Sequence, residues 1–198
     1  MGLDLDFEDG QTPLDENEIQ GLKILGITTK GELDEMEQNN IEEAQLWLLG
    51  RKLTFDQLLT AEFIASLHKK MFGNVWKWAG EFRVTDKNLG IPFFQIPSAL
   101  KQLLDDTKFW IENDTYCSDE IALRFKHRLV SIHCFANGNG RHSRLMADIL
   151  IEKAMNQKIF TWGMSKPSLA ENARSNYLKA IKRADQHDYS ELLKFARS

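Results

Sequence analysis

The stretch His133-Cys134-Phe135-Ala136-Asn137-Gly138-Asn139-Gly140-Arg141-His142-Ser143-Arg144 decides the fold of this chain. It links two segments whose apolar residues recur at helical spacing. Gly138 and Gly140 permit a positive φ and leave the main chain open to close approach by a ligand. Successive N–H groups in such a turn, followed by a helix N-terminus, favour an anion. The stretch therefore predicts a phosphate-binding turn between two helices.

Three charged or titratable side chains flank these glycines. Arg141 and Arg144 are three positions apart, so a helix places both guanidinium groups on one side. Guanidinium groups beside a glycine-rich helix start suit bidentate phosphate binding. His133 stands at the other rim, where a neutral imidazole can remove a proton at neutral pH. Each feature alone is common in structural roles, but their combination predicts a base next to a phosphate site.

The stretch resembles the signature of the Fic-domain family, H-x-F-x-(D/E)-G-N-G-R-x-x-R. It matches that signature at His133, Phe135, Gly138, Asn139, Gly140, Arg141 and Arg144. Residues 78–83 are similar to the approach to the family's flap, and Tyr177 with residues 184–195 to its C-terminal helices. The resemblance spans about residues 35–197. The short chain and the residues of these motifs are most similar to the small bacterial "mobile mystery protein B" subgroup.

The resemblance implies a mainly helical, all-α Fic fold with one small β-hairpin flap. It divides the chain into an acidic N-terminal segment, residues 1–34, and a Fic domain, residues 35–198. Fic enzymes typically transfer AMP from ATP to a hydroxyl of a target protein, here a Ser, Thr or Tyr. The resemblance makes His133 the general base, and Phe135 a buried residue that fixes the loop.

The same resemblance assigns the nucleotide contacts. The main chain of Gly138, Asn139 and Gly140 holds the α- and β-phosphates, and its N–H groups stabilise the charge that develops at phosphorus. Arg141 contacts the β-phosphate and Arg144 the γ-phosphate. The flap adds a strand to an extended target segment, which gives register with little side-chain selectivity. Its docking residues are expected to be Arg83, Val84, Thr85, Phe93, Phe94 and Ile96.

One position departs from the signature. The family's acidic residue, which binds Mg²⁺ (or Mn²⁺) together with the phosphates, is Asn137 here. An amide oxygen can ligate Mg²⁺ but lacks the charge that makes carboxylate a good ligand for this cation. Three interpretations follow: weaker metal use, a different nucleotide or phosphoryl donor, or reduced turnover. The alternatives to AMP transfer are therefore another phosphate-containing donor, removal of AMP, and a non-catalytic module that binds a nucleotide or peptide.

Two further site hypotheses are weaker. Cys134 as a nucleophile would need a lowered pKa, which the nearby arginines could provide. His127, His133 and His142 could be imagined as metal ligands, but their spacing matches no usual zinc pattern.

The rest of the chain predicts helices joined to one hairpin. The hairpin pairs residues 81–85 with 91–96 across the turn-rich link 86–90. Helices are expected over residues 32–49, from Thr54 to about Phe72 and ended by Gly73, from Pro97 onward, after a cap at Ser118, over about 141–155, and over roughly 169–195.

The acidic residues are unevenly distributed. The chain has 29 Asp+Glu against 25 Lys+Arg and a net charge of -4, yet residues 1–22 hold no basic residue. Thr12-Pro13-Leu14-Asp15-Glu16-Asn17 fits the pattern (S/T)-x-x-x-E-(G/N) of the family's inhibitory helix. The resemblance makes Glu16 a candidate inhibitor that pairs with Arg144, Glu32 a rival without the final Gly or Asn, and a capped surface helix the plain alternative.

Composition excludes a disordered chain, a collagen and a disulfide-stabilised scaffold. A chain of 198 residues with 42% hydrophobic and 27% charged residues is ordinary for one globular domain. Two cysteines, no secretory leader and no long apolar run predict a cytoplasmic protein with free thiols and no membrane partner. The small negative charge gives no reason to expect a nucleic-acid partner.

Overall fold

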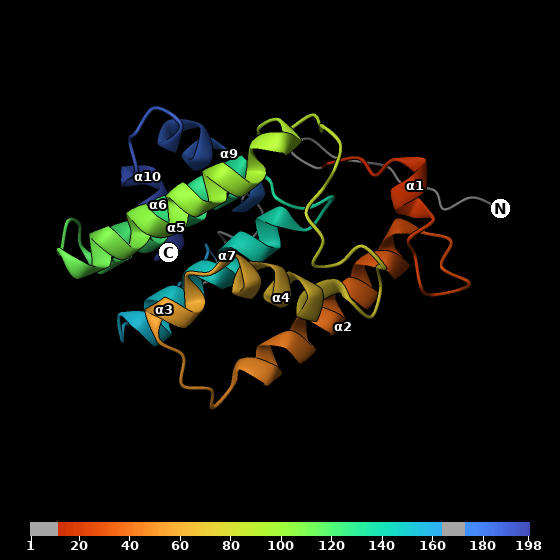
Figure 1. Ribbon diagram of the computed structural model, residues 1–198, viewed down its shortest axis with the longest axis horizontal. Helices are drawn as coiled ribbons and strands as arrows, with labels where there is room; N and C mark the ends of the chain where they lie inside the picture. The colour runs from red at the N-terminus through yellow and green to blue at the C-terminus, as the bar shows by residue number, and fades with distance from the viewer. Residues whose placement is uncertain (1–11, 164–172) are drawn as a thin grey trace.

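The computed structural model describes residues 12–163 and 173–198, and these ranges form an assembly of helices (Figure 1). The elements in chain order are α1 (Glu16–Ile19), α2 (Lys30–Leu48), α3 (Phe55–Leu58), α4 (Ala61–Phe72), the 3-10 turn η1 (Phe93–Gln95), α5 (Ile96–Glu112), α6 (Ser118–Ile132), α7 (Asn139–Ile149), the π-helical turn η2 (Leu150–Ala154), α9 (Ala173–Ala184) and α10 (Ser190–Ala196). The predicted, mainly helical fold class is confirmed.

The main core lies where α2, α4, α5, α6 and α7 meet. Among these helices the most extensive contacts are those of α2 with α4, α5 with α6, and α6 with α7, and α4 also contacts α7. Each helix contributes an apolar stripe at three- and four-residue spacing, so that its other face remains polar. The largest fully buried side chains include Trp76, Phe72, Phe125 and Phe135. Phe135 belongs to the signature stretch, so the loop that carries the site is anchored in the centre of the core.

A second apolar cluster attaches the C-terminal helices. α10 packs on both α9 and α6. Buried residues of α9 and α10 meet small and apolar residues of α6 and α7; they include Ala180, Ala184, Leu192, Ala122 and Ala147. The helices before and after the signature loop therefore contact both the main core and the C-terminal pair.

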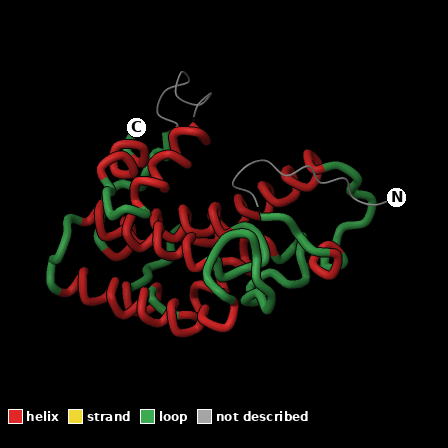
Figure 2. The backbone as a smooth tube through the Cα atoms, turned by 90° about the horizontal axis from the view of Figure 1, so that it is seen from above, coloured by secondary structure: helices red, strands yellow, loops and turns green. Residues whose placement is uncertain are grey.

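The predicted β-hairpin is not formed. Within residues 12–163 and 173–198, no strand is present, and residues 81–92 run as an irregular loop that ends in η1. Figure 2 shows this segment as part of a bundle of loops beside the helices. We call residues 81–95 the flap segment. Arg83 explains the difference, because its guanidinium bonds the carbonyls of Thr85 and Ile91. Those carbonyls belong to the two predicted strands and would otherwise be available to a strand ladder.

Several helix boundaries also differ from prediction. The segment from Thr54 to Phe72 is two helices, because Thr60 turns the chain and caps α4 by accepting the N–H of Phe63. The predicted capping box at Thr54 and the end at Gly73 are confirmed. Ser118 begins α6 rather than capping it.

The last two predicted helices differ as well. The helix predicted over residues 141–155 begins two residues earlier, at Asn139, and changes to a π-helical turn after Ile149. The helix predicted over residues 169–195 is two helices, α9 and α10, and its first part lies outside the described residues.

The N-terminal segment is attached to the body by main-chain bonds. Leu22 forms an isolated antiparallel bridge with Trp76, and the N–H of Lys77 donates to Gly21 O at 2.8 Å. α2 runs unbroken through residue 34, where the predicted segment ends, so the segment and the body share a helix. The described ranges contain no helix with the length and apolar character needed to cross a membrane.

Candidate active site

The site begins where α6 ends. The chain leaves the helix at His133, which has φ 59 and ψ 61, and its N–H still donates to Leu129 O at 3.3 Å. This left-handed conformation is uncommon for a residue with a side chain, although histidine adopts it more readily than most. It bends the chain sharply from α6 into the signature loop. Backbone strain of this kind persists only when surrounding contacts hold it in place.

Arg83 supplies those contacts. Its Nε donates to His133 O at 2.6 Å, and it also bonds two carbonyls of the flap segment. Gly90, at φ +98, lies so close to His133 that a Cβ there would collide with the histidine side chain. Arg83 therefore joins the flap segment to His133.

The flap set predicted from the sequence divides into buried and exposed residues. Arg83 is 5% exposed and Ile96 is fully buried, which corrects their predicted role as docking residues for a target. The other four predicted docking residues, Val84, Thr85, Phe93 and Phe94, are exposed.

The middle of the loop is closed by Phe135 and Asn139. The N–H of Phe135 donates to Asn139 Oδ1 at 3.0 Å, and Asn139 Nδ2 donates back to Phe135 O at 2.8 Å. The Phe135 ring stacks on His68 with centroids 3.7 Å apart. Phe135 is thus buried as predicted. The Asn139 side chain holds the loop, so only its main chain faces a ligand.

Two buried histidines support the loop, and sequence reasoning gave neither of them this role. His68 Nδ1 accepts the N–H of Gly80 at 3.0 Å, so Nε2 carries the proton and donates to Asn137 O at 3.0 Å. His142 Nε2 donates to Ile64 O at 3.0 Å. Burial lowers the pKa of His68 well below its usual value and that of His142 to about 3. In the sequence, only their position on apolar helix faces indicates that these two histidines are buried.

These neutral histidines predict an acid-sensitive fold. Folded His142 has a pKa of about 3, whereas the unfolded residue titrates near 6.5, so between these values the unfolded chain binds more protons. His142 therefore leaves the free energy of unfolding unchanged above about pH 6.5 and lowers it as the pH falls below that value. The loss at pH 4 is several kcal/mol, since each pKa unit is worth about 1.4 kcal/mol. Urea unfolding between pH 7 and 4 measures this slope. His142→Gln keeps a donor for Ile64 O and should flatten it; an unchanged slope would contradict the assignment.

The N-terminus of α7 forms the floor of the site. Gly138 precedes it with φ 77 and ψ −2, and no side chain caps the helix. The N–H groups of Asn139, Gly140 and Arg141 have no acceptor within the helix and carry the positive end of its dipole. A Cβ placed at Gly140 would meet no atom within 4 Å, so the main chain there is open. This geometry suits a phosphate, as the sequence predicts.

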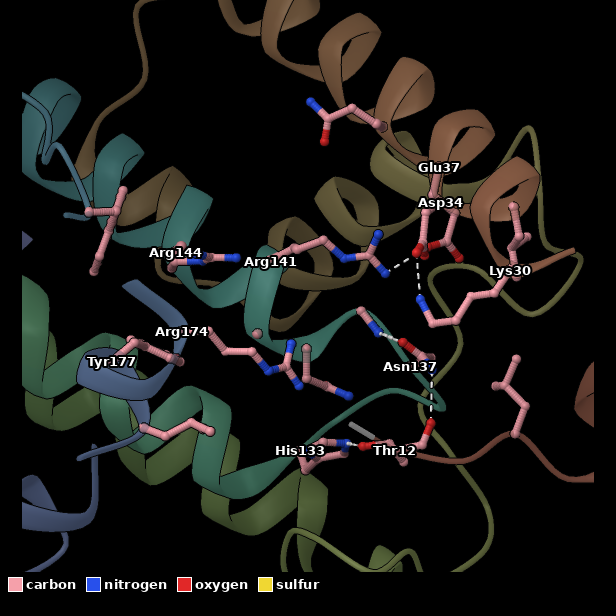
Figure 3. A pocket seen from close by; sticks show the side chains of 18 of the residues that line it. Thr12, Lys30, Asp34, Glu37, His133, Asn137, Arg141, Arg144, Arg174 and Tyr177 are labelled. Atoms are coloured by element: carbon pink, nitrogen blue, oxygen red, sulfur yellow. Dashed lines mark hydrogen bonds and ion pairs between the residues drawn. The ribbon is translucent and has the colours of Figure 1, made fainter. Parts of the chain in front are cut away.

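A cavity of about 540 Å³ lies over this floor (Figure 3). The cations that line it are Lys30, Arg141, Arg144 and Arg174, and the carboxylates are Asp34 and Glu37. Trp162, Tyr177 and Phe195 give one side an apolar, aromatic lining. The volume is typical of small-molecule sites. A cationic floor beside aromatic rings suits a molecule that combines phosphates with a flat ring.

The two signature arginines have different surroundings. Arg141 Nη2 lies 2.6 Å from Glu37 Oε2, and the Trp76 indole holds the other oxygen of this carboxylate. Arg144 lies over the Tyr177 ring, 5.7 Å from its centroid. In the described part of the chain, no carboxylate forms an ion pair with Arg144. A carboxylate of the chain itself thus occupies one arginine and leaves the other to a ligand.

Asn137 and Thr12 close the cavity next to His133. Thr12 Oγ1 lies 2.9 Å from His133 Nε2, and Asn137 Nδ2 donates to Thr12 O at 3.0 Å. Asn137 Oδ1 accepts the N–H of Gly138 at 2.6 Å. Both ends of this amide are therefore used within the chain. The described residues contain no cluster of three His, Cys, Asp or Glu side chains that could hold a metal. This donor set does not fit a protein-held Mg²⁺.

Other predicted residues lie apart from the cavity. Glu16 is exposed on α1 and does not line it, and Glu32 accepts main-chain N–H groups that cap α2. Burial raises the pKa of Cys134 to about 12, so its thiol stays protonated and is no nucleophile. His127 bonds Asp185 at 2.8 Å, away from His133 and His142, so the three histidines do not form a metal site.

Comparison with protein families decides the assignment. The model of the Fic/DOC family matches residues 58–151, which include the whole signature stretch. The chain contains a Fic/DOC family domain. The finer resemblance to the "mobile mystery protein B" subgroup stays a prediction.

Named relatives agree with this family. Protein adenylyltransferase Fic of Drosophila grimshawi is 28% identical over 141 residues, which are 69% of this chain and 28% of that protein. Its counterpart in Drosophila willistoni is 29% identical over 142 residues, 69% of this chain and 27% of that protein. The chain therefore spans about a quarter of the length of these relatives.

Solved Fic domains share the fold. BepC of Bartonella tribocorum, with bound AMPPNP, superposes with a TM-score of 0.69 at 19% identity, over 96% of this chain and 93% of that one. Residues 134–508 of Fic-1 from C. elegans give a TM-score of 0.63 at 20% identity, over 90% of this chain and 50% of that one. Identities this low establish the fold of the Fic domain described here and nothing finer.

Proposed function

We propose that this Fic domain transfers AMP from ATP to a Ser, Thr or Tyr hydroxyl of a target protein, with His133 as the general base. One observation carries the proposal: an aliphatic hydroxyl, that of Thr12, is hydrogen-bonded to His133 Nε2 at the edge of a cationic, phosphate-sized floor. An alcohol therefore fits against the base, and the triphosphate site lies beside it.

The protonation state of His133 suits this role. Burial and the charge of Arg83 lower its pKa to about 4, so the ring is neutral at pH 7. In the neutral ring one nitrogen carries the proton and the other can accept one, and Nε2 is the nitrogen that faces the Thr12 hydroxyl. Nε2 is then free to accept a proton from the attacking hydroxyl.

The loop would handle the developing charge. As the acceptor oxygen bonds to the α-phosphorus, the bond to the β-phosphate breaks and pyrophosphate leaves. The N–H groups at the start of α7 lie on the floor of the cavity, where charge on the phosphoryl oxygens grows. Arg141 would hold the β-phosphate and Arg144 the γ-phosphate, and the aromatic side of Trp162 and Tyr177 would face the adenine ring.

The exposed part of the flap segment is the proposed docking surface for the target. Val84 is 75%, Phe94 68% and Phe93 39% exposed, which is unusual for large apolar side chains next to a site. Together with Thr85 they would contact an extended peptide that presents its hydroxyl to His133.

A second candidate function keeps the fold and changes the donor or the direction of transfer. It is favoured by Asn137, whose amide is used within the chain and does not offer the carboxylate of the family signature. A non-catalytic module that binds nucleotide or peptide is the third. The intact base and the open α7 N-terminus favour an enzyme over this module.

Labelled ATP, GTP, CTP and UTP, each with Mg²⁺ or Mn²⁺, test these functions together. Transfer of label from the α-phosphate of ATP to protein supports the proposal. Preference for another nucleotide, or release of AMP from modified protein, supports the second candidate. Nucleotide binding without any transfer or removal leaves only the binding module.

The inhibitory glutamate is open to a direct test. We infer that Glu37, rather than the exposed Glu16, competes with a phosphate, because its carboxylate occupies Arg141. Glu37→Gln keeps an oxygen for the Trp76 indole but removes the charge. We expect it to bind ATP up to about tenfold more tightly, equivalent to about 1.4 kcal/mol, by titration calorimetry.

Glu16→Gly is the matched control, and we expect it to leave ATP affinity unchanged. If Glu16→Gly tightens binding and Glu37→Gln does not, the inhibitory role belongs to Glu16. Weaker binding by Glu37→Gln would show that this carboxylate positions Arg141 for the nucleotide.

A further inference from the structure

Thr12 occupies the place next to the base where an acceptor hydroxyl belongs. Its Oγ1 lies 2.9 Å from His133 Nε2, across 121 positions of sequence. Both residues are 6% exposed, so water has little access to this contact. Thr12 also lines the cavity that Gly138, Gly140 and Arg144 border. The hydroxyl thus lies beside His133, on the wall of the cavity that contains the proposed phosphate site (Figure 3).

The segment around Thr12 is fixed to both sides of the site. On the loop side, Asn137 Nδ2 donates to Thr12 O at 3.0 Å. A carboxylate at position 137 would present two acceptors to this carbonyl and could not make that bond. The asparagine that departs from the family signature therefore serves to hold Thr12.

The second anchor is on the flap segment. Lys87, whose side chain is only 7% exposed, lies 2.5 Å from Glu18 and 3.5 Å from Asp15 of the N-terminal segment. The Trp78 indole donates to Glu18 O at 3.0 Å. An ion pair this sheltered is stronger than one on the surface, because less solvent screens it. Figure 1 shows α1 beside the start of α2, with the N-terminal segment next to the loops of the flap.

We propose that Thr12 is itself an acceptor, so that the enzyme transfers AMP in cis to the Thr12 hydroxyl. This inference rests on the proposed function, since it uses the same donor and the same base. His133 Nε2 takes the proton of Oγ1, the oxygen forms a bond to the α-phosphorus of ATP, and the bond between that phosphorus and the β-phosphate oxygen breaks. The products are adenylylated Thr12 and pyrophosphate.

Modification would also remove the segment from the site. Before transfer, the hydrogen bond between Thr12 Oγ1 and His133 Nε2 helps to hold the segment against the base. The modified threonine no longer has a hydroxyl proton for His133. The segment would leave, and the base would be accessible to the hydroxyl of a separate protein.

The test uses the full chain incubated with ATP labelled at the α-phosphate and Mg²⁺, followed by intact-mass measurement and peptide mapping. We expect one AMP on the peptide that contains Thr12 in the wild type and in Thr12→Ser, which keeps the hydroxyl. Thr12→Val, which has the same shape without a hydroxyl, should lose that label. Because the reaction is in cis, the fraction labelled per minute should not change on tenfold dilution of the protein.

A parallel measurement separates this inference from the proposed function. Proteins of a cell lysate are offered as acceptors to wild type, Thr12→Val and a His133→Asn control. His133-dependent label on lysate proteins, or on other residues of this chain, without label on Thr12 overturns the cis acceptor and leaves the function intact. Faster lysate labelling by Thr12→Val with no Thr12 label would show that Thr12 only blocks the base. If no protein carries His133-dependent label, both the cis acceptor and the proposed function are contradicted.

Discussion

Replacing His133 by alanine is expected to lower the rate of AMP transfer about 100- to 10,000-fold, the usual contribution of a general base. ATP affinity should change little, because the floor of the phosphate site is the N-terminus of α7 and not the imidazole. The expected kinetic signature is therefore a loss of rate without a loss of binding. Single-turnover transfer from labelled ATP and calorimetric titration of ATP measure the two quantities separately.

The left-handed conformation of His133 requires a second variant. Alanine adopts a φ of 59 less readily than histidine does, so a loss of rate in His133→Ala could come from a displaced loop. Asparagine tolerates this conformation and its amide is not a base. His133→Asn should fold like the wild type and be as inactive as His133→Ala. A rate near that of the wild type in His133→Asn would show that His133 is not the base.

The sequence predicts the signature loop well because its requirements are local. Gly138 and Gly140 mark a tight turn at a helix start, and Arg141 and Arg144 share a helix face by spacing alone. The structure places all four on one cavity, together with His133. Their chemistry follows from residue type and from positions within a short stretch, which is the information a single sequence contains.

The flap segment shows what such reasoning misses. Its residues alternate as strands would, yet Arg83 takes the carbonyls of Thr85 and Ile91, and Gly90 packs on His133. These contacts depend on where α6 ends, 49 or 50 positions away in sequence from Arg83. Local strand propensity cannot include them, because tertiary contacts override it.

The two internal occupants of the site were missed for the same reason. Glu37 reads as one more charged residue of a polar helix, and Thr12 as a helix cap. Only the packing of α2 on α4 brings Glu37 to Arg141, and only the anchors at Asn137 and Lys87 bring Thr12 to His133. The inhibitory pattern of residues 12–17 singles out Glu16, but the residues of that stretch that line the cavity are Thr12 and Leu14.

Gly140→Ala is expected to abolish ATP binding and AMP transfer while leaving the fold unchanged. A Cβ at this position meets no protein atom within 4 Å, so the protein itself does not resist it. Alanine also favours a helix over glycine by about 0.5–1 kcal/mol, so the midpoint of urea unfolding should stay the same or rise. The added methyl group would instead fill the space that a phosphate needs to approach the N–H groups of α7.

Gly31 provides a closely matched control. Gly31 is the second residue of α2 as Gly140 is of α7, and a Cβ there also meets nothing within 4 Å. It does not line the cavity. Gly31→Ala should therefore show the same small gain in helix stability with wild-type ATP affinity and transfer. If Gly140→Ala binds ATP like Gly31→Ala, the phosphates do not approach the start of α7, and the nucleotide lies elsewhere in the cavity.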